Sequence, residues 1–103
     1  MLLNHQLIAR LRELAGRGTS IRDLVDEIRD YLKTDDGLAL VADRYFKEAF
    51  LLPLGDVRPI EGSPGLGGKA YSDEQIDRLM LPRIESTRHL WQSHTTEEIE
   101  AAR

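Results

Sequence analysis

The longest pattern of hydrophobic positions in this chain lies in its middle, over residues 36–52. At 100° per residue, its apolar side chains cover one broad face and the flank beside it, which is typical of a helix surrounded by other helices. The face contains Leu38, Val41, Ala42, Tyr45, Ala49 and Leu52, and the flank contains Phe46 and Phe50. The expected polar wedge consists of Asp43, Arg44, Lys47 and Glu48. We expect Asp35 or Asp36 to cap this helix, and Pro53 cannot continue it.

Two amphipathic helices are predicted before this central one. Asn4 can cap the first, over about residues 5–15, and the glycines at 16 and 18 favour its end because glycine readily takes the left-handed conformation. Ser20 can cap the second, whose apolar residues recur at i, i+3, i+4, i+7 and i+11. These residues are Ile21, Leu24, Val25, Ile28 and Leu32.

After the central helix the composition changes. Residues 53–71 contain three of the four prolines and five of the eight glycines, which predicts a long loop that is either functional or mobile. Its scattered apolar residues indicate that parts of the loop pack on the helices, and we expect a mobile tip over residues 63–68.

Helical signals resume at Ser72, which forms a plausible capping box with Gln75. Pro82 lacks an N–H group, so it should either kink one helix or separate two. Because proline suits a first helical turn, we favour two pieces, over residues 73–80 and 82–92. The second piece should bury Ile84, Leu90 and part of Trp91.

These patterns predict an all-α protein, a small bundle of four to five helices with a long Gly/Pro-rich loop between helices three and four. Residues 1–94 are expected to form a single helical domain, and residues 95–103 a short tail or frayed helix. A length of 103 residues fits one domain with a core of its own.

Composition narrows the possible functions. The absence of cysteine excludes disulfides, thiolate zinc sites and cysteine nucleophiles, and suits a reducing cytoplasm. We find no signal-peptide pattern and no apolar run near the roughly 20 residues that span a bilayer. The net charge of −4 argues against a protein built mainly to hold nucleic acid, but it leaves room for a basic partner. We therefore expect a cytoplasmic protein.

The glycine-rich segment only superficially resembles a phosphate-binding loop. Gly62 and Gly67 have the required spacing, but Gly68 intervenes before Lys69, and Ala70 replaces the metal-binding hydroxyl. No strand is predicted before the segment, as that motif requires. A plain loop is the better interpretation.

Metal and acid–base chemistry find little support. Glu85 and His89 are four residues apart and could share a helix face, but no third ligand accompanies them, and the other histidines are His5 and His94. The paired carboxylates lie on exposed helix faces, where nothing excludes water. We expect no catalytic residue, no metal and no cofactor, and therefore not an enzyme.

The second helix carries the most distinctive charge pattern. Four carboxylates, Asp23, Asp26, Glu27 and Asp30, fall within roughly 100° of one another, opposite the apolar stripe. Like charges at this spacing each cost a few tenths of a kcal/mol. A solvated helix face is the simpler explanation, and a docking strip for a basic protein is the sharper one.

A helix-turn-helix is the alternative, because a short turn joins the second and central helices. The central helix would then contact DNA, but Arg44 and Lys47 are the only basic residues of its polar wedge. The acidic second helix beside it would be repelled by the DNA phosphates.

Scattered residues in the second half of the chain also carry a resemblance. They are Arg44-Tyr45-Phe46, Ala49-Phe50, Pro59-Ile60-x-Gly62, Ser72-Asp73, Ile76-Asp77, Pro82-x-Ile84, Arg88 and Trp91. This pattern resembles short bacterial helical proteins like the immunity proteins of polymorphic toxin systems. The resemblance implies a toxin inhibitor and carries over no catalytic residue.

The sequence therefore favours a non-enzymatic protein-binding module, an immunity or antitoxin-like inhibitor that occludes a basic partner such as a toxin or nuclease. Asp23, Asp26, Glu27 and Asp30 are its candidate partner-binding residues. The alternative is a small regulatory or DNA-associated helical protein. The oligomeric state stays open.

Overall fold

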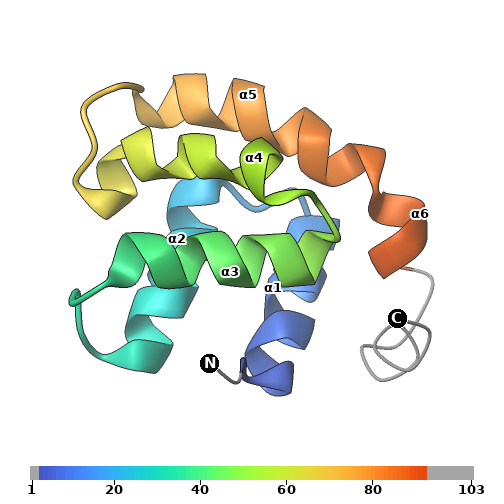
Figure 1. The fold of residues 1–103 in the computed structure, drawn as a ribbon. Coiled ribbons are helices and arrows are strands. Elements are labelled where there is room, and N and C mark those ends of the chain that lie inside the picture. Colours follow the sequence, from blue (N-terminus) through green and yellow to red (C-terminus); the bar gives the residue numbers. More distant parts are fainter. Residues whose placement is uncertain (1–2, 93–103) are drawn as a thin grey trace.

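A computed structural model describes residues 3–92 of the chain, and every regular element in that range is helical (Figure 1). The elements are α1 (His5–Gly16), α2 (Ile21–Leu32), α3 (Leu38–Phe50), α4 (Leu54–Val57), the 3₁₀ helices η1 (Arg58–Gly62) and η2 (Pro64–Leu66), α5 (Asp73–Ser86) and α6 (Arg88–Trp91). The all-α prediction is confirmed. The expected tail, residues 95–103, lies outside the described residues.

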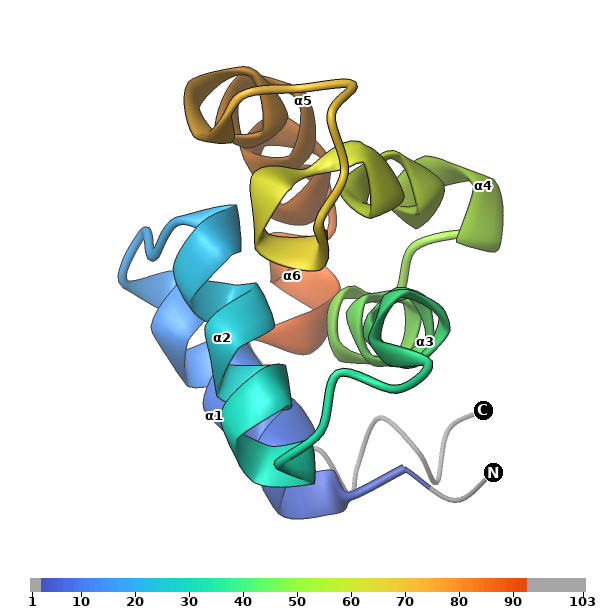
Figure 2. The same cartoon turned by 90° about the vertical axis from the view of Figure 1, so that its left-hand side faces the viewer.

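Helix α3 occupies the centre of the arrangement. Elements α1, α2, α4, η1 and α6 all contact it, while α5 packs on α2, η1 and α6. In Figure 2, α1 and α2 form a pair on one side of α3. The chain from α4 to η2 lies between α5 at the top of the view and α2 and α3 below. The predicted surrounding of the central helix by other elements is confirmed.

The predicted caps of three helices are confirmed. The Asn4 side chain accepts a hydrogen bond from the Leu7 amide at 2.9 Å. The Ser20 side chain does the same for Asp23 at 3.2 Å. Ser72 forms a full capping box with Gln75. Each side chain supplies an acceptor for an amide that a helix start leaves without an intrahelical partner.

The predicted cap of α3 is wrong. Gly37 is the N-cap residue, at a φ of 66°, and no side chain accepts a hydrogen bond there. The Asp35 carboxylate instead accepts from Arg29 Nε at 2.7 Å. Glycine takes the left-handed conformation without a steric penalty, so the turn from α2 enters α3 through its backbone geometry.

Residues 53–71 contain more regular structure than expected of a loop. They include α4, η1 and η2, and an irregular connection to α5 begins only after Leu66. Ser63 and Gly65, within the expected mobile tip, are buried. The prolines explain this result in part, because Pro59 and Pro64 both lie in the first turn of a 3₁₀ helix, where a missing N–H costs little.

Pro82 does not divide the helix, so the prediction of two pieces that meet there is wrong. It lies inside α5, which continues to Ser86 before α6 begins at Arg88. The carbonyl of Arg78, four residues earlier, loses its usual partner. Both Pro82 and Arg78 are exposed, so water can take that place.

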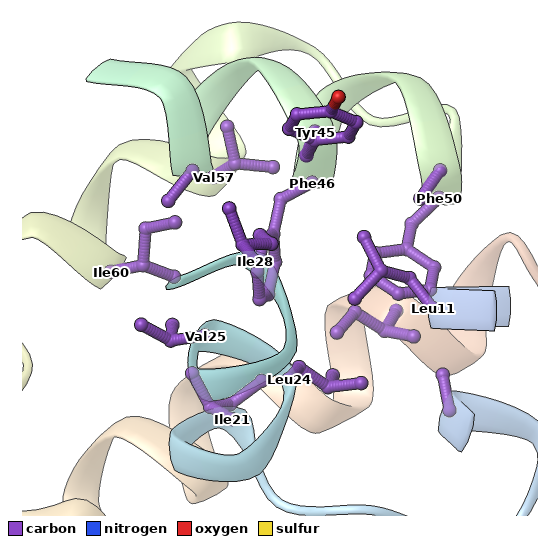
Figure 3. Packing of buried hydrophobic residues seen from close by; sticks show 14 of the residues in the cluster. Leu11, Ile21, Leu24, Val25, Ile28, Tyr45, Phe46, Phe50, Val57 and Ile60 are labelled. Atoms are coloured by element: carbon purple, nitrogen blue, oxygen red, sulfur yellow. The ribbon is translucent and has the colours of Figure 1, made fainter. Parts of the chain in front are cut away.

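The core contains residues of α1, α2, α3, α4, η1, α5 and α6, and Figure 3 labels ten of them, from α1, α2, α3, α4 and η1. Phe46 and Phe50 pack edge to face at 5.6 Å, and Phe50 packs in the same way on Trp91 at 5.4 Å. Leu24, Ile28, Tyr45, Phe46 and Ala49 are buried as predicted, and Val41 is half-buried. Ile84 and Trp91 are buried, but Leu90, which we predicted to be buried, is 42% exposed.

Side chains from other elements donate hydrogen bonds to the last carbonyls of α3. Arg12 of α1 donates from Nε to the Ala49 carbonyl at 2.6 Å and from Nη2 to the Glu48 carbonyl at 2.9 Å. Thr87 Oγ1 donates to the Phe50 carbonyl at 2.6 Å. These carbonyls have no partner within the helix, so the side chains both satisfy them and join α1 and the α5–α6 corner to α3.

Across the described range, no helix is both long enough and apolar enough to cross a membrane.

Phe46→Ala should lower the free energy of unfolding by about 3–5 kcal/mol, because it removes a fully buried ring from the middle of the core. Urea denaturation followed by circular dichroism measures the change. Leu40→Ala is the control on the same helix, since Leu40 is 59% exposed, and it should change stability by about 0.5 kcal/mol or less. A loss below about 1 kcal/mol for Phe46→Ala would contradict the central position of α3.

Candidate functional site

The acidic face predicted on the second helix lies along the outer side of α2. The opposite stripe, from Ile21 to Ile28, is fully buried and fixes the orientation of the helix. Its first turn is also held by α5, because Asp77 Oδ1 accepts from the Ile21 amide at 2.8 Å. The acidic side chains are therefore carried by a rigidly placed helix.

The four carboxylates divide into two kinds. Asp23 and Asp30 are exposed, whereas Asp26 and Glu27 are half-buried. Asp26 Oδ1 pairs with Arg29 Nη1 at 2.8 Å, and Glu27 Oε2 lies 3.8 Å from Arg10 Nε of α1. The sequence had suggested four equivalent charges. The structure makes Asp23 and Asp30 the more accessible pair and gives the other two a part in packing α2.

An open hollow of about 350 Å³ lies beside this face, between α1 and α2. Leu7 and Tyr31 contribute apolar surface to it, and Glu27 and Asp30 contribute carboxylates. Tyr31 is 49% exposed and lines this hollow. Tyr31 was not predicted to lie in this site. Its position directly after Asp30 and outside the apolar stripe could have indicated an exposed aromatic side chain there.

The polar wedge of α3 is not uniformly exposed, which corrects the sequence prediction. Asp43 is only 2% exposed, and its Oδ1 has no hydrogen-bond partner among the described residues. Arg44 is exposed, and Lys47 lies 3.5 Å from Glu48 in a half-buried pair. The reason is that η1 packs against α3, so a side of the helix that looks polar in isolation is covered.

The environment of Asp43 changes its protonation. The pKa of this carboxyl is raised to about 7: burial is the main cause, the hydrogen bond with Glu61 and the negative charge of Glu61 add to it, and the charge of Arg58 opposes them. Burial acts in this direction because a low-dielectric surrounding disfavours the charged form. Both Glu61 and Arg58 belong to η1.

The segment that carries η1 and η2 is packed closely on itself and on α2. Arg29 Nη2 donates to the Gly65 carbonyl, and the same guanidinium pairs with Asp26 and Asp35. The Gly68 amide donates to the Ser63 carbonyl at 2.9 Å. Arg29 therefore links the acidic helix to this segment, and its own pKa is raised, chiefly by the hydrogen bond with Asp35.

A second hollow, of about 600 Å³, lies where the end of α2, the start of α3 and η2 meet. Leu38, Leu40 and Leu66 contribute apolar surface to it, and Arg29 and Glu61 contribute charge. It adjoins the segment packed on α3 and is distinct from the hollow beside the acidic face.

Within residues 3–92, no group of three or more histidine, aspartate or glutamate side chains is placed to hold a metal ion. Glu85, the one carboxylate that could have accompanied His89, pairs with Arg88 at 2.9 Å. His94 lies outside the described residues.

Comparisons of this chain with protein-family models, curated protein sequences and solved structures give no match. The resemblance to immunity proteins therefore stays a hypothesis, and a functional proposal has to come from the chemistry of the chain itself.

Gly68→Ala should destabilise the protein by about 1–3 kcal/mol, the range for overpacking, because a Cβ at this position would lie 2.5 Å from the Glu61 carbonyl oxygen and as close to Gly62. Gly55→Ala is the matched control, since a Cβ there meets no atom within 4 Å. Thermal unfolding of the two variants measures the difference. Equal stability of Gly68→Ala and wild type would show that the segment is not closely packed.

Proposed function

We propose that this chain is a non-enzymatic protein-binding module that docks a basic partner protein on the outer face of α2. Such a module acts as an immunity or antitoxin-like inhibitor, covering a cationic active site such as that of a nuclease. The observation that carries the proposal is the pair of exposed carboxylates, Asp23 and Asp30, on a helix whose other side is fixed in the core, with the exposed ring of Tyr31 beside them.

The spacing of these residues suits a protein partner. Asp23 and Asp30 are seven residues apart, so they lie on one line about 10 Å apart along the helix axis. Two basic side chains on a partner could meet them at once, while Tyr31 offers apolar area in the adjoining hollow. Aromatic residues at the centre of a polar rim are typical of protein interfaces.

The electrostatics of the face favour rapid association. Asp23 and Asp30 remain in water, where opposite charges on a partner steer the encounter without a large desolvation cost. Asp26 and Glu27 already interact with arginines of this chain, so they contribute less free charge and more rigidity. We therefore assign recognition mainly to Asp23, Asp30 and Tyr31.

The carboxylates of this face are less suited to acid–base catalysis. General acids and bases need a site that excludes water and brings the group within hydrogen-bond reach of a substrate. The exposed carboxylates have no such enclosure, and the buried Asp43 Oδ1 is out of contact with solvent.

The alternative, a DNA-associated helical protein, gains no support from α3. Arg44 is the exposed basic residue of that helix, and Lys47 is half-buried beside Glu48. A recognition helix needs several accessible side chains toward base edges and phosphates.

Charge reversal on the docking face should weaken partner binding selectively. The experiment is to co-express the chain with the product of the adjacent gene, purify the complex, and measure association rates at low and high salt. Asp23→Lys with Asp30→Lys should slow association by about tenfold or more at low salt, and added salt should produce the same slowing in the wild type.

The matched control is Asp56→Lys with Glu74→Lys, which changes the net charge equally at exposed positions on α4 and α5. Both double variants should keep near-wild-type stability, since exposed substitutions usually change it by about 0.5 kcal/mol. Equal slowing by the control would reduce the effect to net charge, and unchanged association in the α2 variant would remove α2 from the interface.

A further inference from the structure

Asp43 and Glu61 place two carboxyl groups at the contact between α3 and η1. Asp43 is 2% exposed on the side of α3 that η1 covers, and its Oδ1 has no hydrogen-bond partner among residues 3–92, while Glu61 of η1 acts on the same carboxyl. Polar atoms this deeply buried are nearly always satisfied, so an unpartnered carboxyl oxygen calls for an explanation.

We propose that Asp43, facing Glu61, forms a pH-operated latch, which holds residues 58–68 against α3 while Asp43 carries a proton and loosens when Asp43 is ionised. The latch is independent of the docking function proposed above, because none of its groups belongs to the α2 face.

The physical basis is the difference between a protonated and an ionised Asp43. With a proton, one carboxyl donates an O–H hydrogen bond to the other, and only one negative charge has to be accommodated. Without it, two negative charges face each other, and one of them is removed from water. Arg58 is the nearby opposite charge, and it offsets this repulsion only in part.

Three cations of the elements packed on α3 already have partners. These are Arg12 of α1 on the Ala49 and Glu48 carbonyls, Arg29 of α2 on Asp26, Asp35 and Gly65, and Arg88 of α6 on Glu85, Gln92 and Gly16. On α4, Asp56 adds a further negative charge, and on α6, His89 is exposed. On α3 itself, Lys47 lies 3.5 Å from Glu48 and Arg44 is exposed. Arg58 is thus the cation that acts on the Asp43 carboxyl.

The segment that the latch holds covers apolar surface. Ile60 is fully buried against the core, Ser63 is also buried, and the Gly65 carbonyl accepts a hydrogen bond from Arg29 of α2. Loosening of residues 58–68 would expose the side of α3 that they cover. The latch thus couples the protonation of Asp43 to the accessibility of an apolar face.

The direction of the pH dependence follows from the two states of the chain. The pKa of Asp43 is about 7 in the folded protein against an ordinary value of 3.8, so the folded state binds this proton more tightly. The stability that the proton provides is complete below about pH 4, decreases as the pH rises, and is lost above about 7. This slope is opposite to that of an ordinary salt-bridged carboxylate.

The test compares the wild type with Asp43→Asn by urea unfolding at intervals from pH 5 to pH 8.5. Asparagine keeps the shape of the side chain and can donate an N–H to Glu61 at every pH. The ratio of the wild-type unfolding constant to that of Asp43→Asn should rise by up to about tenfold per pH unit until about pH 7 and then level off. The control ratio, with the exposed Asp36→Asn, should stay constant.

Hydrogen exchange locates the effect. After correction for intrinsic exchange, the amides of Ser63, Gly68 and Tyr71 should lose protection between pH 6 and pH 8.5 more than amides of α2 do, and this difference should disappear in Asp43→Asn. Should Asp43→Asn fail to fold, Glu61→Gln removes the like charge and should weaken the wild-type slope. A wild-type slope that both variants retain, or equal loss of protection throughout the chain, would overturn the latch.

Discussion

The enclosure of α3 is the constraint on which the rest of this structure depends. Its apolar surface is too broad for a single partner, so α1 and α2 cover one side, η1 and α4 another, and α6 the region around Phe50. Such enclosure leaves the end of the helix away from water. Arg12 and Thr87 resolve this problem by donating to its last carbonyls, which makes α1 and the start of α6 part of the same hydrogen-bonded unit.

Enclosure also separates two groups of acidic residues that look alike in the sequence. On α2, Asp23 and Asp30 stay in water, where each charge carries little desolvation cost and remains available to a partner. On α3, Asp43 is removed from water, where an ionised carboxyl is costly and protonation becomes the easier state. The carboxylates of α2 suit long-range electrostatic recognition, and Asp43 makes part of the fold sensitive to pH.

Much of this fold was predictable, because α1, α2 and the start of α5 combine regular apolar spacing with capping residues that act locally. Asp43 was placed wrongly because a helical projection shows which residues are apolar and nothing about what covers the others. Its cover comes from residues 58–62, whose short 3₁₀ turn has no periodic signal. The continuation of α5 through Pro82 was not predicted for a related reason. A proline inside a helix leaves the Arg78 carbonyl without its usual partner, and the free-energy cost of that loss depends on whether water can reach the carbonyl. At the acidic face, the positions were predictable, but the partial burial of Glu27 depends on Arg10 of another helix.

The order of the elements along the chain has a consequence for biosynthesis. The first three helices leave the ribosome before α5 and α6, yet Phe50 needs Trp91, and the α2 stripe needs the cover that α5 provides. A nascent chain that has reached only residue 72 therefore still presents apolar surface to its surroundings. Such intermediates are where aggregation competes with folding. The second half of the chain thus completes the core of a first half that is made earlier.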